Sequence, residues 1–381
     1  MIRPSLLRLV ERHGSAQEAP VTESFFSSTY EEARQRFVTA AERAGARMSR
    51  YPVPIAGKAE DAFTIDVAIL GQADSPTLVT SSGVHGVEGF LGSAVQLAQL
   101  QAFGSDIARH VCWVFVHAVN PFGFSQIRRF NEANVDLNRN FLSDRSQYSG
   151  ASTSYARLDD FLNPAAPPSI VEPFRLKALW KIARYGLGTL KQSIAQGQYA
   201  YPRGIFFGGD APSQAFRIIE ENMSQWIGRA QHVLHVDFHS GLGAFGDYKL
   251  LLAELTGSDN CEWYERVFGQ DVVEATDSSA ATAYRASGPM GEWLQDHFAD
   301  RSYRFVTAEF GTYGPVRVLG AIRAENRAHH FGAETSHAFR NAKRELLECF
   351  CPADRKWRRK AIASGLKVLS QGARALEADD S

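Results

Sequence analysis

Two histidines and a glutamate have the types and positions of a metal site. His85 and Glu88 lie three residues apart in the glycine-rich stretch SSGVHGVEGFLGSA, where a helix begins, so both side chains can reach one ion from the same side. His239, in VDFHSGLG, is followed by small residues that leave room beside it. A catalytic zinc site takes three such ligands and keeps a fourth position open. These three residues are candidate ligands, although a lone His-x-x-Glu pair is weak evidence.

The residues around His239 offer supporting groups. Asp237 precedes it by two positions on the same strand face, where a carboxylate can hold a ligand histidine in the tautomer that binds metal. His235 shares this face, and we interpret it as a hydrogen-bonded core histidine, with a role behind the ligands as the alternative. Ser240 lacks the Gly-x-Ser-x-Gly elbow of a serine nucleophile. Cobalt or manganese could replace zinc in such a site, and nothing calls for a second metal.

The elements that would position these residues alternate between strand and helix. Five segments are typical of strands: FTIDVAIL, TLVTSSG, VCWVFVHAVNP, AQHVLHVDFHSG and YRFVTAEFG. Helical patterns occur at 30–46 and in GFLGSAVQLAQLQAFG. This order predicts an α/β fold with a mostly parallel, mixed sheet flanked by helices. Ligands bind at the carboxyl ends of such strands, and His85, His239 and Glu309 each lie at or just past a predicted strand end.

Two further regions are predicted to be helical. Residues 142–204 interrupt the alternation, and we expect a helical insertion that walls or covers the mouth of the site and narrows the accepted substrates. Residues 352–381 form a basic helical tail, expected to pack on the domain with a solvated outer face, with membrane contact as the alternative. The chain as a whole, 1–381, is predicted to be a single domain.

Composition limits the partners. Of 381 residues, 44% are apolar and 22% are charged, as in ordinary globular proteins. The net charge of −1 offers no electrostatic case for a nucleic-acid partner, and the sequence lacks the run of about 18 apolar residues that a membrane span needs. The N-terminus does not look like a signal peptide, and the four cysteines are expected to be reduced thiols. We therefore predict a cytoplasmic protein without a nucleic-acid or membrane partner.

Several motifs in fixed order resemble the zinc carboxypeptidase superfamily, which contains carboxypeptidase A, succinylglutamate desuccinylase and aspartoacylase. The resemblance covers roughly residues 75–315 and rests on these segments in order: His85-x-x-Glu88, Asn120-Pro121, Arg129, Asp136-Leu137-Asn138-Arg139, His239, the AYRASG segment with Tyr284, and Glu309. More narrowly, SSGVHGVEGFLGS, RRFNEANVDLNRNF and EFGTYG resemble an uncharacterised, mainly bacterial branch labelled a domain of unknown function.

The resemblance implies a role for the central residues. His85, Glu88 and His239 would hold one zinc ion. Glu309 would be the general base, and Arg129 would stabilise the oxyanion that forms on the scissile carbonyl. Arg128 is adjacent to Arg129 and is the alternative for this role; we expect it to form a structural ion pair.

The resemblance also implies substrate contacts. Asn138 and Arg139 would bind a substrate carboxylate, which arginine can grip as a bidentate fork, and Tyr284 would close over the substrate. Gly291, near the position where some carboxypeptidases carry a specificity residue, has no charge. A preference for basic C-terminal residues therefore lacks support.

We thus expect a zinc-dependent metallopeptidase of the carboxypeptidase type, which cleaves an amide bond next to a free carboxylate. One alternative is an N-acyl amino acid deacylase, and a related one is hydrolysis of cell-wall peptides with unusual linkages. The helical pattern after residue 315 argues against the desuccinylase and aspartoacylase branch, which usually adds a β-rich C-terminal domain. A non-catalytic metal-binding or ligand-binding protein is the remaining alternative, and the presence of Glu309 argues against it.

Overall fold

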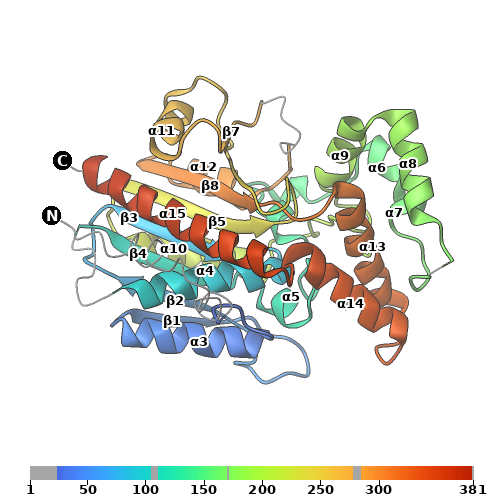
Figure 1. Ribbon diagram of the computed structural model, residues 1–381, viewed down its shortest axis with the longest axis horizontal. Helices are drawn as coiled ribbons and strands as arrows, with labels where there is room; N and C mark the ends of the chain where they lie inside the picture. The colour runs from blue at the N-terminus through green and yellow to red at the C-terminus, as the bar shows by residue number, and fades with distance from the viewer. Residues whose placement is uncertain (1–23, 104–109, 170, 278–284, 380–381) are drawn as a thin grey trace.

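The strands form one eight-stranded sheet in the order β1-β2-β4-β3-β5-β8-β6-β7 (Figure 1). The computed structural model describes residues 24–103, 110–169, 171–277 and 285–379. The strands are β1 (Arg47–Pro52), β2 (Thr64–Leu70), β3 (Thr77–Ser82), β4 (Cys112–His117), β5 (His232–Ser240), β6 (Tyr248–Leu251), β7 (Val273–Glu274) and β8 (Ser302–Phe310). The central strands β4, β3, β5 and β8 run parallel, and antiparallel pairs flank them. The expected mixed α/β fold is confirmed.

The helices surround the sheet and extend beyond one end of it (Figure 1). In chain order they are α3 (Tyr30–Arg43), η1 (Gly86–Glu88), α4 (Gly89–Ala102), α5 (Pro121–Ser125), η2 (Leu137–Arg139), η3 (Arg145–Gln147), α6 (Thr153–Ala156), α7 (Asp159–Leu162), α8 (Phe174–Tyr185), α9 (Leu187–Ala195), α10 (Gln214–Ile227), α11 (Asp259–Phe268), α12 (Met290–His297), α13 (Pro315–Phe331), α14 (His337–Phe350) and α15 (Arg355–Asp379).

Helices cover both faces of the central strands, so β3, β4 and nearly all of β5 are buried on both sides of the sheet. On one face, Gly372 of α15 lies so close to the sheet that an added Cβ would be 2.5 Å from Leu234. On the other face, Gly291 of α12 meets the ring of Phe305, the register partner of His235 on β5. His235, Asp237 and His239 alternate with Leu234 and therefore share the α12 face.

Three strands were not predicted from the sequence. β1 forms one edge of the sheet, and β6 and β7 form the other. The β1 sequence, RMSRYP, has no apolar run, and its residues are exposed or half-buried. β6 and β7 are only four and two residues long. Edge strands bury less surface, so their sequences carry a weaker signal.

The insertion predicted at 142–204 contains η3, α6, α7, α8 and α9. Within the insertion, Gly186 separates α8 from α9 with a positive φ of 80°. Glycine tolerates this conformation because it has no Cβ. The insertion lies beside the α13–α14 hairpin (Figure 1), and the two share an apolar cluster that includes Leu190, Ile194 and Val318.

The tail helix α15 packs on α4, β3 and β5. Its apolar side, which includes Trp357, Val368 and Leu369, is buried. This apolar side contacts the protein rather than a membrane. All four cysteines are free and buried. Among the described residues, we find no helix of sufficient length and apolarity to cross a membrane.

Candidate metal and catalytic site

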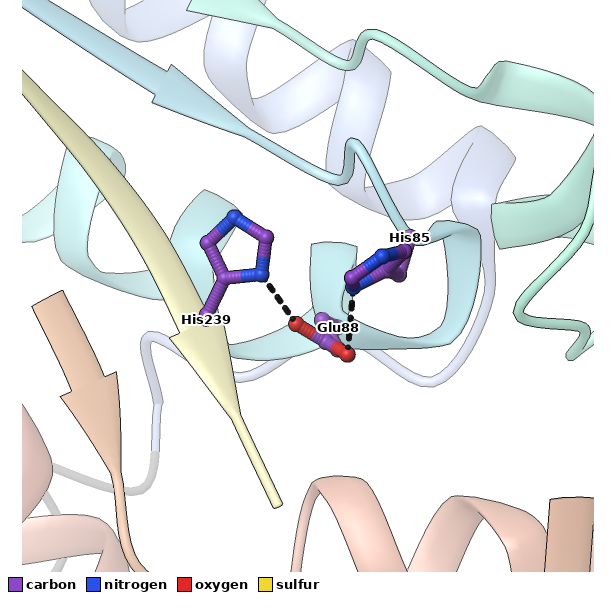
Figure 2. Close-up of side chains that lie close together, drawn as sticks. All are labelled: His85, Glu88 and His239. Carbon is purple, nitrogen blue, oxygen red and sulfur yellow. Dashed lines mark hydrogen bonds and ion pairs between the residues drawn. The ribbon is translucent and has the colours of Figure 1, made fainter. Parts of the chain in front are cut away.

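His85, Glu88 and His239 meet where β3 and β5 end. His85 follows β3 and precedes η1, Glu88 is the residue before α4, and His239 is on β5. Figure 2 shows Glu88 between the two imidazole rings. Its two carboxylate oxygens each lie 2.9 Å from a histidine Nδ1, Oε1 from that of His85 and Oε2 from that of His239. All three side chains are buried, so they form one compact set of potential ligand atoms.

A tight turn holds His85 and Glu88 in place. Gly86, between them, packs on the backbone of the α5 segment, where an added Cβ would lie 2.1 Å from the carbonyl carbon of Gly123. The backbone N–H groups of Gly86 and Val87 donate to the carbonyls of Arg129 and Arg128. The turn is therefore fixed by the same segment that supplies the arginines.

Each histidine has a second carboxylate on its other ring nitrogen. His85 Nε2 lies 3.1 Å from Asp136 Oδ1, and His239 Nε2 lies 2.6 Å from Asp237 Oδ2. A proton held on Nε2 by these carboxylates leaves the Nδ1 lone pair free to bind a metal. The Asp237 contact is the one expected from the sequence. Asp136 is part of the Asp136-Leu137-Asn138-Arg139 motif, and its contact with His85 was not predicted.

The donor set suits zinc. The three candidate ligand atoms all lie within 4.8 Å of one another. Two imidazole nitrogens and one carboxylate, with room left beside them, are the ligand types of catalytic zinc sites. Burial alone would raise the pKa of Glu88, but the adjacent His85 and His239 lower it, so the carboxylate stays ionised.

Asp237 is the end of a directed hydrogen-bond chain beneath the site. Ser81 Oγ donates to Asp237 Oδ1 at 2.6 Å and lies 2.7 Å from His235 Nε2. His235 Nδ1 lies 2.9 Å from the Tyr303 hydroxyl. Because Ser81 has one proton to donate, His235 must donate to it through Nε2 and accept from Tyr303. Burial lowers the pKa of His235 to about 4, consistent with a neutral ring. The interpretation as a hydrogen-bonded core histidine fits this chain.

The two adjacent arginines point to different places. Arg129 bonds Asp136 Oδ2 through Nε at 2.8 Å and approaches Glu88 Oε1 at 3.4 Å, so it faces the candidate ligands. Arg128 bonds Glu325 Oε1 at 2.9 Å and is fully buried away from the pocket. Arg129 Nη2 also lies 2.7 Å from His85 Nε2. His85 Nε2 cannot both donate to Asp136 and accept from Arg129. We therefore place a proton on His85 Nε2 and assign it to the hydrogen bond with Asp136.

Glu309 lies on β8 beside His239, its register partner on the neighbouring strand β5. Its Oε1 accepts the backbone N–H of Leu242 at 2.8 Å. Burial, and then the neighbouring Glu88, raise the pKa of Glu309 to about 7. A cation at the candidate ligands would favour the ionised carboxylate.

The predicted substrate residues are only partly described. Asn138 and Arg139 line the same pocket as the ligands. Arg139 donates through Nε to the carbonyl of Ala195, the last residue of α9, at 2.9 Å, and Asn138 Oδ1 accepts from the N–H of Met290 at 3.0 Å. Tyr284 lies outside the described residues.

One cavity with a volume of about 250 Å³ contains the site. It is lined by the three candidate ligands and by Arg129, Asn138, Arg139 and Glu309. Its walls are mainly apolar and come from α8, α9, α12 and α13, with Ile182, Leu190 and Leu319 among them. Lys191 and Glu274 bring charge to the wall. Residues of the insertion therefore form part of the cavity wall, and a restriction of the accepted substrates stays a prediction.

Sequence reasoning missed Asp136, Ser81 and Tyr303. The Asp136-Leu137-Asn138-Arg139 motif was the available signal for Asp136. Ser81 and Tyr303 belong to strands distant in the sequence, and only the pairing of β3, β5 and β8 brings them to His235. The sequence contained no sign of that link.

Comparison with known families and structures is informative at the level of fold. The pattern of the family described as "Protein of unknown function (DUF2817)" matches residues 26–364. Bovine thrombin-activatable fibrinolysis inhibitor, solved with tick carboxypeptidase inhibitor, superposes with a TM-score of 0.51 at 12% identity, over 93% of this chain and 98% of that one. At this identity the match shows a shared fold.

Two further structures match less well. Carboxypeptidase A from Helicoverpa armigera has a TM-score of 0.44 at 15% identity, over 88% of this chain and 74% of that one. A candidate metallopeptidase from Shewanella amazonensis also gives 0.44 at 15%, over 84% and 93%. The search of curated proteins finds no match.

Proposed function

Because this chain belongs to the DUF2817 family and has a carboxypeptidase-like fold, we propose that it is a zinc-dependent hydrolase that cleaves an amide bond next to a free carboxylate. The observation that carries the proposal is the convergence of His85, Glu88 and His239 in one cavity with Arg129 and Glu309. A non-catalytic binding site would not need a buried carboxylate and an arginine beside the ligand set.

The proposed chemistry divides among the side chains. A zinc ion, when bound, would supply Lewis-acid polarisation and make water more acidic. Glu309 takes a proton from the attacking water and delivers it to the leaving nitrogen, which allows the C–N bond to break. Arg129 donates hydrogen bonds to the oxyanion that develops on the carbonyl oxygen. The bond from Arg129 to Asp136 holds the guanidinium in place for this task.

Asn138 and Arg139 are proposed to recognise the substrate carboxylate. Both line the cavity, and Arg139 is held at the C-terminal end of α9 by the carbonyl of Ala195. The insertion is proposed to restrict the substrate, because Ile182 and Leu190 line the cavity that a peptide end would enter. A small acyl amino acid would fill the same space, so the two substrate classes must be separated by experiment.

A mass-spectrometric substrate screen tests the proposal. The zinc-loaded protein is offered free-acid peptides, the same peptides as C-terminal amides, and N-acyl amino acids, with Glu309→Gln as the blank. Loss of one C-terminal residue from the acids but not from the amides is the expected result. Cleavage of only N-acyl amino acids would assign the protein to the deacylases. Equal turnover by the blank would refute the role of Glu309.

A further inference from the structure

Exposed apolar side chains are concentrated in the insertion. Among the residues that the structure describes, eight large apolar side chains are strongly exposed, and six of them lie between residues 171 and 187. These six are Val171, Leu176, Leu179, Trp180, Tyr185 and Leu187. Single exposed apolar residues are common, but a cluster of this size marks an interaction surface.

The central part of this cluster is a stripe along the outside of α8. Leu176, Leu179 and Trp180 are 69%, 55% and 62% exposed, and with Ala183 they follow the i, i+3, i+4, i+7 spacing of one helix face. The opposite side of α8 carries the buried Ala178 and the half-buried Ile182, which line the cavity. The outward stripe is therefore not the face that lines the cavity, and Leu176 and Trp180 also border a separate surface hollow lined by Phe161 and Glu172.

Positive charge flanks the stripe on both sides. α8 contains Arg175, Lys177, Lys181 and Arg184 and no acidic residue. At 100° per residue, Arg175 lies on one side of the stripe, and Lys177 and Arg184 lie on the other. A helix with leucine and tryptophan on one face and basic residues beside them is typical of helices that lie in a membrane surface.

We propose that the outer face of α8 docks on an anionic lipid surface. Leu176, Leu179 and Trp180 enter the boundary between headgroups and acyl chains, and the basic side chains face the anionic headgroups. A second copy of the chain is a poorer occupant, because a symmetric contact would bring the basic flanks of both copies together. The sequence analysis expected no membrane partner from the absence of a spanning segment, but a helix lying in the surface needs none.

Ion pairs fix the start of α8 to the rest of the protein. Glu172, just before α8, bonds Arg323 Nη2 at 2.6 Å and also pairs with Arg327, both on α13. Lys181 and Leu187 line the cavity. Docking through α8 would therefore place the cavity close to the lipid surface.

Flotation with lipid vesicles tests the proposal on the full chain. Vesicles of phosphatidylcholine are compared with vesicles that also contain phosphatidylglycerol. We expect the protein to float with the anionic vesicles and to be released by added salt. The variant Leu176→Ser/Leu179→Ser/Trp180→Ser should bind them at least about ten-fold more weakly. The matched control Phe245→Ser/Leu255→Ser changes the other two exposed side chains, 44% and 54% exposed, and should bind normally.

A charge variant guards against misfolding of the apolar one. Arg175→Glu/Arg184→Glu changes only exposed side chains, spares Lys177 because it pairs with Glu172 at 3.7 Å, and should abolish binding to the anionic vesicles. The proposal is overturned if the unmodified protein ignores both kinds of vesicle, or if the control loses binding as much as the stripe variant. It is also overturned if sedimentation shows a dimer that the stripe substitutions dissociate while vesicles remain unbound. Substrate turnover does not enter these readouts, so failure of the proposed enzymatic function would not affect them.

Discussion

Asp136 and Asp237 hold the two candidate ligand histidines in the same manner. Each bonds Nε2 of its histidine, at 3.1 Å for His85 and 2.6 Å for His239. Each therefore directs the Nδ1 lone pair of that histidine toward Glu88. The two carboxylates come from unrelated parts of the fold, one from the loop before η2 and one from β5. This shared arrangement favours metal binding, because it selects the histidine tautomer whose Nδ1 lone pair is free to coordinate a metal.

Loss of either carboxylate should weaken metal binding. We expect Asp136→Asn and Asp237→Asn each to lower zinc affinity by about 10–100-fold. Both oxygens of each carboxylate are engaged, whereas an amide is uncharged and has only one acceptor oxygen. Competition against a chelating dye measures the affinity. The exposed Asp300, which pairs with Arg301, provides the control substitution Asp300→Asn. Unchanged affinity in both site variants would separate these carboxylates from metal binding.

Glu309→Gln should abolish turnover and leave zinc content intact. The substitution removes a proton acceptor whose contribution is about 10²–10⁴ in rate, and Gln can still accept the Leu242 N–H bond that positions the side chain. Elemental analysis gives the zinc content, and kcat is measured on the substrate found in the screen. A variant that keeps full activity with bound zinc would exclude Glu309 as the base.

Substitutions of the two adjacent arginines should have different effects: one on catalytic activity and the other on stability. Arg129→Lys keeps a positive charge near Asp136 but loses the planar fork, and we expect kcat to fall by about 10²–10³. Arg128→Met should instead lower the free energy of unfolding by about 3 kcal/mol, because Glu325 stays buried with only Lys343 to neutralise it. Urea unfolding and kcat are compared for both variants. The reverse pattern would exchange the two roles.

Two glycines should respond oppositely to alanine. Gly86→Ala places a Cβ 2.1 Å from the backbone of Gly123, so the turn that holds His85 and Glu88 must move. We expect a loss of about 1–3 kcal/mol in stability together with weaker zinc binding. Gly188→Ala, in α9, meets nothing within 4 Å and should stabilise the protein by about 0.4–1 kcal/mol. Calorimetry with and without zinc distinguishes the two.

The pairing of Glu172 with α13 should make the free energy of unfolding depend on pH. Hydrogen bonds from Arg323 and Arg327 outweigh the effect of burial and lower the pKa of Glu172 from 4.5 to about 2. Because the folded pKa is depressed, this stabilisation is complete above about pH 4.5 and is lost as the pH falls toward 2. Glu172→Gln should be less stable than the parent protein at neutral pH, and the difference should shrink between pH 4.5 and 2. Urea unfolding across this range measures it, and a constant difference would contradict the prediction.

Strong local patterns explain how much was predictable from sequence. The five strands that were predicted, β2, β3, β4, β5 and β8, are mostly buried, and each was found. The candidate ligands could be identified from the sequence because His85 and Glu88 are close together in the chain and His239 lies near the end of a buried strand. The edge strands were missed because they bury little, and the break at Gly186 was missed because a helical composition continues on both sides of it.

What the sequence determined by itself is local: the residue types of the candidate site, the elements that carry them, and their order along the chain. What only the tertiary structure decided is which groups meet. The pairing of β3, β5 and β8 joins Ser81, His235 and Tyr303 beneath the site. Packing also turns Arg129 toward the ligands and Arg128 away, and leaves the apolar stripe of α8 facing outward. Such contacts join residues far apart in the chain, and no local spacing encodes them.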